Sequence, residues 1–131
     1  MPKKVLCPPN LSFQPRPEYP YSPGTRGGRL VYTAGQVAWN ERAELVGLGD
    51  PTAQTRQVLA NIESILREGG ATLADVLKCN VYLADIGHFQ AMNEVFASVF
   101  SEDPPARTTV QAALAEPEML VEIEAIAYVG E

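Results

Sequence analysis

The sequence predicts an α+β protein in which two helices cover one face of a β-sheet. Three observations lead to this fold class: strand-like alternation near the carboxyl end, two segments with apolar residues at helical spacing, and strands at both ends of the element order. A chain of 131 residues, 46% hydrophobic and 20% charged, is large enough to bury one core. We therefore expect a single domain over residues 1–131.

The first part of the chain predicts short strands and one shaped loop. Residues 5–6 and 11–13 are strand-like, but two prolines separate them. Residues 14–29 hold four prolines and three glycines, which predicts an irregular loop able to carry binding groups. Residues 30–36 then predict a strand, and residues 37–48 a hairpin or loop.

Two helices are predicted, with a strand between them. Asp50 and Pro51 are a favourable N-cap and first helical residue, and Gly69 with Gly70 ends this helix near residue 68. Its apolar stripe is Leu59, Ile62, Ile65 and Leu66, and its polar flank is Gln54, Gln57 and Asn61. A strand is predicted over residues 76–83, with four side chains on one face: Leu77, Cys79, Val81 and Leu83. The second helix is predicted over about residues 86–100, and the side chains that it points toward the core are Phe89, Met92, Phe96 and Val99.

Two strands are predicted near the carboxyl end, over residues 107–114 and 120–128. One row of the second strand is wholly apolar: Val121, Ile123, Ala125, Ala127 and Val129. The opposite row mixes two carboxylates with apolar residues: Leu120, Glu122, Glu124, Ile126 and Tyr128. We expect Arg107 on this mixed face as well. Because both helices cover the other face, the mixed face would expose an apolar patch, and we expect a homo-oligomer.

Composition excludes several classes of partner. The net charge of −6 argues against nucleic acid, because phosphate binding needs a basic patch. No run approaches the roughly 20 apolar residues of a membrane span, and the amino terminus lacks the apolar segment of a secretory signal. The cytoplasm is therefore the expected location. Cys7 and Cys79 are expected to be reduced thiols, with Cys79 packed in a strand.

No recognisable motif for a metal, a nucleotide or a catalytic triad is present. The single histidine, His88, has no second soft ligand nearby, and a surface position at a helix start explains it. There is no nucleophile elbow, and the glycines of residues 24–28 match no phosphate-binding pattern. We expect no metal and no cofactor.

Arg107 and Glu122 are the candidate functional residues, and each has a structural alternative. Arg107 is either a solvated or ion-paired residue, or a planar fork that binds a substrate carboxylate in a bidentate pair. Glu122 is either an exposed acid or the partner of Arg107, or else a general base that positions water. Glu124 could exchange roles with Glu122. Together with a loop that carries tyrosines, these residues indicate a site for a small anionic ligand.

Seven segments, in order along nearly the whole chain, resemble the Rid/YjgF family of small imine and enamine deaminases, also called the endoribonuclease L-PSP family. They are PYS (20–22), VYTAGQ (31–36), QTRQVLANIESIL (54–66), GGATLADVLKCNVYLADI (69–86), FQAMNEVFASVF (89–100), PPARTTV (104–110) and LVEIEAIA (120–127). The resemblance implies a chorismate-mutase-like fold with a mixed sheet, assembled as a homotrimer with sites between subunits. It also implies cofactor-free hydrolysis of reactive 2-imino and 2-enamino acids, such as 2-aminoacrylate, to 2-keto acids and ammonia.

The resemblance assigns roles to particular residues. Arg107 of PAR would bind the substrate carboxylate, and Glu122 of EIE would orient or deprotonate water. Tyr21 of PYS would line the cleft from the neighbouring subunit, and Asn93 and Gly35 match family positions near the site. Thr109 is expected at the substrate, in the place where many members have cysteine.

Three other features depart from the family pattern. Ala34 replaces the usual serine, and the loop over residues 21–28 differs in its sequence. In this loop Arg26 could enter the site as an additional cation. Trp39 either shapes the pocket or packs as an ordinary hairpin aromatic.

Three functions are therefore compared. The first is a deaminase that uses Arg107 and Glu122. The second is a non-catalytic trimeric protein that binds or senses small carboxylic acids through the same arginine. The third is a protein-interaction or chaperone-like role, which would survive loss of Arg107. Glu122 favours the first, because a simple carboxylate binder does not need an acid beside its arginine. Ribonuclease activity has been attributed to relatives, but an acidic chain with one histidine argues against it here.

Overall fold

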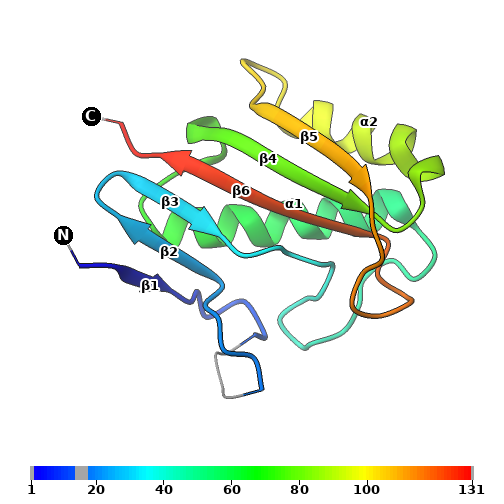
Figure 1. The fold of residues 1–131 in the computed structure, drawn as a ribbon, viewed down its shortest axis with the longest axis horizontal. Coiled ribbons are helices and arrows are strands. Elements are labelled where there is room, and N and C mark those ends of the chain that lie inside the picture. Colours follow the sequence, from blue (N-terminus) through cyan, green and yellow to red (C-terminus); the bar gives the residue numbers. More distant parts are fainter. Residues whose placement is uncertain (1, 14–17, 131) are drawn as a thin grey trace.

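Both helices lie on the same face of a six-stranded mixed sheet, as the sequence predicts (Figure 1). The computed structural model describes residues 2–13 and 18–130. The strands are β1 (Lys4–Leu6), β2 (Gly24–Gly27), β3 (Leu30–Thr33), β4 (Val76–Leu83), β5 (Ala106–Gln111) and β6 (Val121–Tyr128). Their order in the sheet is β1-β2-β3-β6-β4-β5. Only β4 and β5 pair in parallel, because α2 (Phe89–Val99) forms the crossover between them.

Helix α1 (Pro51–Glu68) begins and ends where the sequence predicts. The Asp50 carboxylate accepts a hydrogen bond from the backbone N–H of Ala53 at 3.1 Å, and Pro51 needs no partner at the first helical position. Gly70 follows the helix with φ +82°, a conformation that favours glycine. The core lies between α1, α2 and the sheet. The alternate row of β6 is buried there, as predicted: Val121, Ile123, Ala125 and Ala127.

The predicted polar flank of α1 is wrong for two of its three residues. Gln54 is fully buried: its amide donates to the carbonyls of Gly47 and Glu118, and its oxygen accepts from the N–H of Leu120. Asn61 is also buried, and its side-chain amide donates hydrogen bonds to backbone carbonyls of residues 37 and 39, in the segment that precedes the helix. These amides satisfy backbone groups that would otherwise be buried without partners. Burial of α1 therefore extends beyond its apolar stripe.

The amino-terminal segments differ from their predicted structure. The sequence predicts an irregular loop over residues 24–27, but these residues form β2, which pairs with both β1 and β3. Residues 11–13 form no strand, and residues 14–17 of the predicted loop lie outside the described residues. Strand β3 ends at Thr33 instead of residue 36, and β5 ends at Gln111 instead of residue 114. Two glycines and a short length obscured the strand character of β2.

Two further predictions of core positions are wrong. The pairing of β4 with β6 shifts register between Val76 and Lys78, and this bulge leaves Leu77 55% exposed. In α2, Phe89 is 38% exposed, and Val95 is buried in addition to the predicted Met92 and Phe96. None of the helices in the described part of the chain is both long and apolar enough to span a membrane.

Candidate active site

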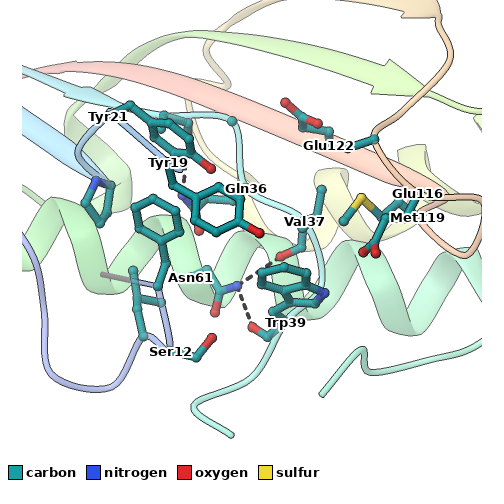
Figure 2. A pocket seen from close by; sticks show the side chains of 16 residues that line it. Ser12, Tyr19, Tyr21, Gln36, Val37, Trp39, Asn61, Glu116, Met119 and Glu122 are labelled. Carbon is teal, nitrogen blue, oxygen red and sulfur yellow. Dashed lines mark hydrogen bonds between the residues drawn. The ribbon is translucent and has the colours of Figure 1, made fainter. Parts of the chain in front are cut away.

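A cavity of about 590 Å3 lies beside Glu122, next to the segment that follows β3 (Figure 2). We call it the Glu122 cavity. Figure 2 shows Glu122 on its strand side and Trp39 and Ser12 on the loops across from it. Its lining is Leu11, Ser12, Phe13, Tyr19, Tyr21, Pro23, Ala34, Gly35, Gln36, Val37, Trp39, Asn61, Ala115, Glu116, Met119 and Glu122.

A β-bulge forms the wall of the cavity next to Glu122. Tyr32 pairs with Ile126, and Gln36 pairs with Ile123. An advance of four residues from β3 is therefore opposite an advance of only three residues along β6. The hydroxyl of Thr33 accepts a hydrogen bond from the N–H of Ala125 at 3.0 Å, which satisfies a donor that the bulge leaves unpaired. Gly35 follows at the bulge, directly against the carboxylate of Glu122. A Cβ at this position would collide with Oε2 of Glu122, so glycine lets the carboxylate keep this position.

Glu122 and Glu124 share a face of β6 but differ in their surroundings. The carboxylate of Glu124 accepts hydrogen bonds from Asn80 at 2.9 Å and from the Tyr82 hydroxyl at 3.3 Å. Glu122 instead lies half-buried in the cavity wall. Burial, and then the negative charge of Glu124, raise the pKa of Glu122 above the ordinary value of 4.5. Of the two carboxylates on this face of β6, Glu122 is therefore the one that lines the cavity.

Tyr21 reaches the same cavity from the loop that precedes β2. Its ring stacks on Phe13 with the centroids 4.6 Å apart, and Tyr19 meets Phe13 edge to face at 5.9 Å. Burial, then the charge of Glu122 and then Tyr19, raise the pKa of Tyr21 above 10.0. The phenol is therefore protonated at neutral pH and can donate a hydrogen bond into the cavity.

Trp39 lies in the cavity lining, and its chain segment is fastened to α1. The Asn61 side-chain amide donates to the carbonyls of Val37 at 3.1 Å and Trp39 at 2.9 Å, and Gln57 donates to the oxygen of Asn61. Trp39 therefore lines the cavity and also belongs to a hairpin, in which it pairs with Leu45. The sequence pattern places Asn61 on the polar flank of the helix but does not indicate this role, because a polar residue on a helix is usually solvated.

Arg107 lies in a second, separate depression of about 450 Å3, which we call the Arg107 hollow. Its guanidinium carbon lies 4.7 Å from the ring centroid of Phe96 and 5.5 Å from that of Phe89, and Nη1 is 4.0 Å from the sulfur of Met92. These groups all belong to α2. Asn93 lines the same hollow, as do Phe100 and the two prolines before β5. Aromatic rings hold the cation at the protein surface and leave its hydrogen-bond donors available to an anion.

Arg107 and Glu122 are on opposite faces of the sheet, which corrects the prediction of a shared face. Strand β4 lies between β5 and β6, and Arg107 pairs with Cys79, whose side chain is buried toward the helices. Glu122 alternates with the buried Val121 and Ile123 and therefore points away from the helices. The prediction is wrong because β5 and β6, although consecutive in sequence, are not neighbours in the sheet.

The structure thus divides the predicted site residues into two groups. Glu122, Tyr21 and Gly35 line the Glu122 cavity, whereas Arg107 and Asn93 line the Arg107 hollow. Thr109 lines neither depression. It follows Arg107 by two positions on β5, and its buried hydroxyl has no hydrogen-bond partner among the described residues.

Arg26, which the sequence leaves open as an additional cation of the site, lines neither depression. Its Nη1 donates to the carbonyl of Gly69 at 2.6 Å and its Nε to that of Gly28 at 2.9 Å, so it binds the carboxyl end of α1. Among the described residues no cluster of three or more metal-ligating side chains is present. His88 is partly buried at the start of α2, and its Nδ1 has no partner in the described part of the chain. Burial raises the pKa of the Cys79 thiol to about 12, so this thiol is protonated at neutral pH.

Comparison with known proteins gives consistent matches over nearly the full length. The family model described as Endoribonuclease L-PSP matches residues 12–129. A RutC family protein of Pyrococcus horikoshii, PH0854, is 44% identical over 114 residues, which are 87% of this chain and 90% of that protein.

Two solved structures are similar in both sequence and fold. Rv2704 of Mycobacterium tuberculosis, described as a member of the YjgF/YER057c/UK114 family, is 42% identical with a TM-score of 0.76, covering 83% of this chain and 86% of that one. YyfA of Yersinia pestis, described as a protein of unknown function of the conserved Rid family, is 33% identical with a TM-score of 0.87, covering 98% and 100%.

Proposed function

We propose that this chain, which belongs to the Rid/YjgF family, also called endoribonuclease L-PSP, is a cofactor-independent deaminase of 2-imino and 2-enamino acids. Compounds such as 2-aminoacrylate and 2-iminopropanoate would be hydrolysed to 2-keto acids and ammonia. The proposal takes the active unit to be a homotrimer with sites between subunits.

One observation carries the proposal: the two candidate groups occupy separate depressions on opposite faces of the sheet. A carboxylate held by Arg107 of one copy could approach Glu122 only from a neighbouring copy. The sheet face opposite the helices supports such an assembly. It exposes a cluster of apolar side chains that we call the open-face patch: Val5, Leu30, Tyr32 and Tyr128.

The reaction needs orientation and proton transfer more than strong chemical activation. The substrate in its protonated form, R–C(=NH2⁺)–COO⁻, would place its carboxylate on Arg107 in a charge-assisted pair. Water positioned by Glu122 would attack C2, and Glu122 would take the proton that this water loses. Glu122 passes this proton to nitrogen and the C–N bond breaks. The carbinolamine hydroxyl gives its remaining proton to the departing ammonia as the carbonyl forms, so the products are the keto acid and ammonium. An enamine would first accept a proton at C3 to become the imine.

Tyr21 and Asn93 supply neutral polar groups at the two depressions. The protonated phenol of Tyr21 could donate to the carbinolamine oxygen that forms after water attacks. Asn93 could donate its amide to the carboxylate beside Arg107. Each balanced turnover consumes one water and one imine, and this scheme uses no cofactor.

The test generates 2-iminopropanoate with an amino-acid oxidase and follows pyruvate release with and without the protein. We expect the wild type to accelerate release, and Arg107→Ala to reduce the enzymatic part by at least about 100-fold, because the carboxylate loses its anchor. Arg56→Ala, an exposed arginine on α1 outside both depressions, should match the wild type. Circular dichroism confirms that each variant is folded.

The outcomes distinguish the deaminase from the two other functions. If no imine is hydrolysed faster but pyruvate still binds through Arg107, the chain is a carboxylate-binding protein. An activity that survives Arg107→Ala and depends on exposed apolar surface would indicate an interaction role. The family description includes endoribonuclease, but a net charge of −6 argues against RNA as the substrate here.

A further inference from the structure

We infer that the Glu122 cavity selects imino acids with large apolar side chains, and that Trp39 sets this preference. The inference rests on the proposed deaminase function and identifies the side chain that its substrate carries. A 2-imino acid with its carboxylate directed toward a partner's Arg107 and its C2 at Glu122 would place its side chain in the remaining cavity. The argument concerns the size, charge and wall of that space.

The cavity is much larger than a substrate with a methyl side chain requires. Its volume of about 590 Å3 is typical of pockets for drug-sized ligands, which span roughly 300–1,000 Å3. Alanine-derived imine would leave most of this space filled with water. A phenyl or isobutyl group would displace that water and bury apolar surface, which stabilises the complex.

The electrostatics of the lining exclude side chains that carry a negative charge. Within the described part of the chain, the charged residues that line the cavity are Glu116 and Glu122, and both are acidic. A second carboxylate on the substrate would meet them without a cation to offset the repulsion. Glu116 is exposed to solvent and contributes little to either repulsion or attraction, so the discrimination against a second carboxylate rests on the half-buried Glu122.

Much of the cavity lining is aromatic and aliphatic, and Trp39 lies across the cavity from Glu122 (Figure 2). The apolar lining residues include Leu11, Phe13, Val37, Trp39 and Met119, while the side-chain amide of Asn61 is already bonded to the carbonyls of residues 37 and 39. A buried donor already paired to backbone offers nothing further to a polar ligand. Trp39 contributes a large, flat surface from a loop that Asn61 fixes to α1. Such a ring is suited to stack against an aromatic or branched side chain.

The experiment compares imines made in the same way from phenylalanine, leucine, alanine, glutamate and arginine. We expect kcat/KM to be about tenfold or more higher for the phenylalanine- and leucine-derived imines than for the alanine-derived one, and lowest for the glutamate-derived one. In Trp39→Ala the ratio of phenylalanine to alanine rates should fall about tenfold. Trp39→Phe should keep most of the preference. Leu48→Ala, an exposed apolar residue of the same connection, should leave the ratio unchanged.

A binding measurement tests the cavity without catalysis. Because Trp39 is the chain's single tryptophan, its fluorescence reports directly on the cavity. We expect 4-methyl-2-oxopentanoate to change it at about tenfold lower concentration than pyruvate.

Several results would overturn the inference while the deaminase stands: equal or better rates with alanine, a preference for arginine, or an unchanged ratio in Trp39→Ala. No acceleration of any imine, with the fluorescence preference intact, would reject the deaminase and leave the cavity's side-chain preference standing. Equal binding of both keto acids would reject the preference itself.

Discussion

Glu122 acquires its chemical character from its neighbours. Its carboxylate lies against a glycine, in a partly buried wall beside a second carboxylate that is already hydrogen-bonded. A free carboxylate with a raised pKa is a better proton acceptor than an ordinary one, provided it is still ionised at the working pH. Two predictions follow from this environment.

The first prediction concerns pH. Because Glu122 must be ionised to accept a proton, the deaminase rate should fall as the pH is lowered through its raised pKa, that is, at a pH above the ordinary 4.5. Glu122→Gln should lower kcat/KM by about 100-fold and remove this pH dependence. Glu124→Gln removes one cause of the raised pKa, so the fall should move to lower pH. A profile that does not respond to either variant would contradict the role of Glu122.

The second prediction concerns Gly35. In Gly35→Ala the new Cβ must displace the Glu122 carboxylate, so kcat/KM should drop by about 10- to 100-fold. Gly27→Ala is the matched control, because a Cβ there has no atom within 4 Å. Steady-state kinetics on both variants, with thermal melts, separate a displaced carboxylate from general loss of folding. Equal rates in the two variants would show that the position of Glu122 does not limit the reaction.

At the scale of elements, α1 supports the cavity through its buried amides. Asn61→Ala would leave the carbonyls of Val37 and Trp39 without their donor, and we expect a loss of about 2 kcal/mol in the free energy of unfolding. Urea denaturation measures it. Arg56→Ala, exposed on the same helix, should change stability by less than about 0.5 kcal/mol. If Asn61→Ala lost as little unfolding free energy as Arg56→Ala, water would have to replace the Asn61 amide as the donor to these carbonyls.

The sequence predicted elements whose signals are local. Asp50, Pro51 and the two glycines define α1 by themselves, and the alternation of β6 identifies its buried row. Strand β2 was missed because its glycines indicate a turn until β1 and β3 are placed on either side of it. Leu77 was assigned to the wrong face because a bulge reverses the alternation.

The sequence selects candidate residues for the site but does not determine how they are arranged. Alternation specifies which side chains share a face within one strand, but not how two strands relate. The relation of Arg107 to Glu122 depends on β4, which lies between their strands and pairs in parallel with one of them. Asn61 and Thr33 support the cavity through backbone contacts with distant segments, which no motif encodes.

At the scale of the whole molecule, the prediction is complementation between inactive copies. If each site takes Arg107 from one copy and Glu122 from another, co-expressed Arg107→Ala and Glu122→Gln chains should recover up to about a quarter of the wild-type rate, because a quarter of the interfaces pair two intact residues. Light scattering should give the mass of three chains. Each variant alone stays inactive. An inactive mixture of correct mass would place both residues in one copy.

The position of β6 in the sheet also bears on how the chain is made. The strand is the last of the six to leave the ribosome, yet it lies between β3 and β4 (Figure 1). Until it emerges, the β1–β3 meander and the β4–α2–β5 unit share no strand pairing, and each presents an unpaired inner edge. During synthesis there is therefore an interval in which the exposed edges of two incomplete sheets can pair with other chains. This interval ends only when the strand that carries Glu122 pairs with both β3 and β4.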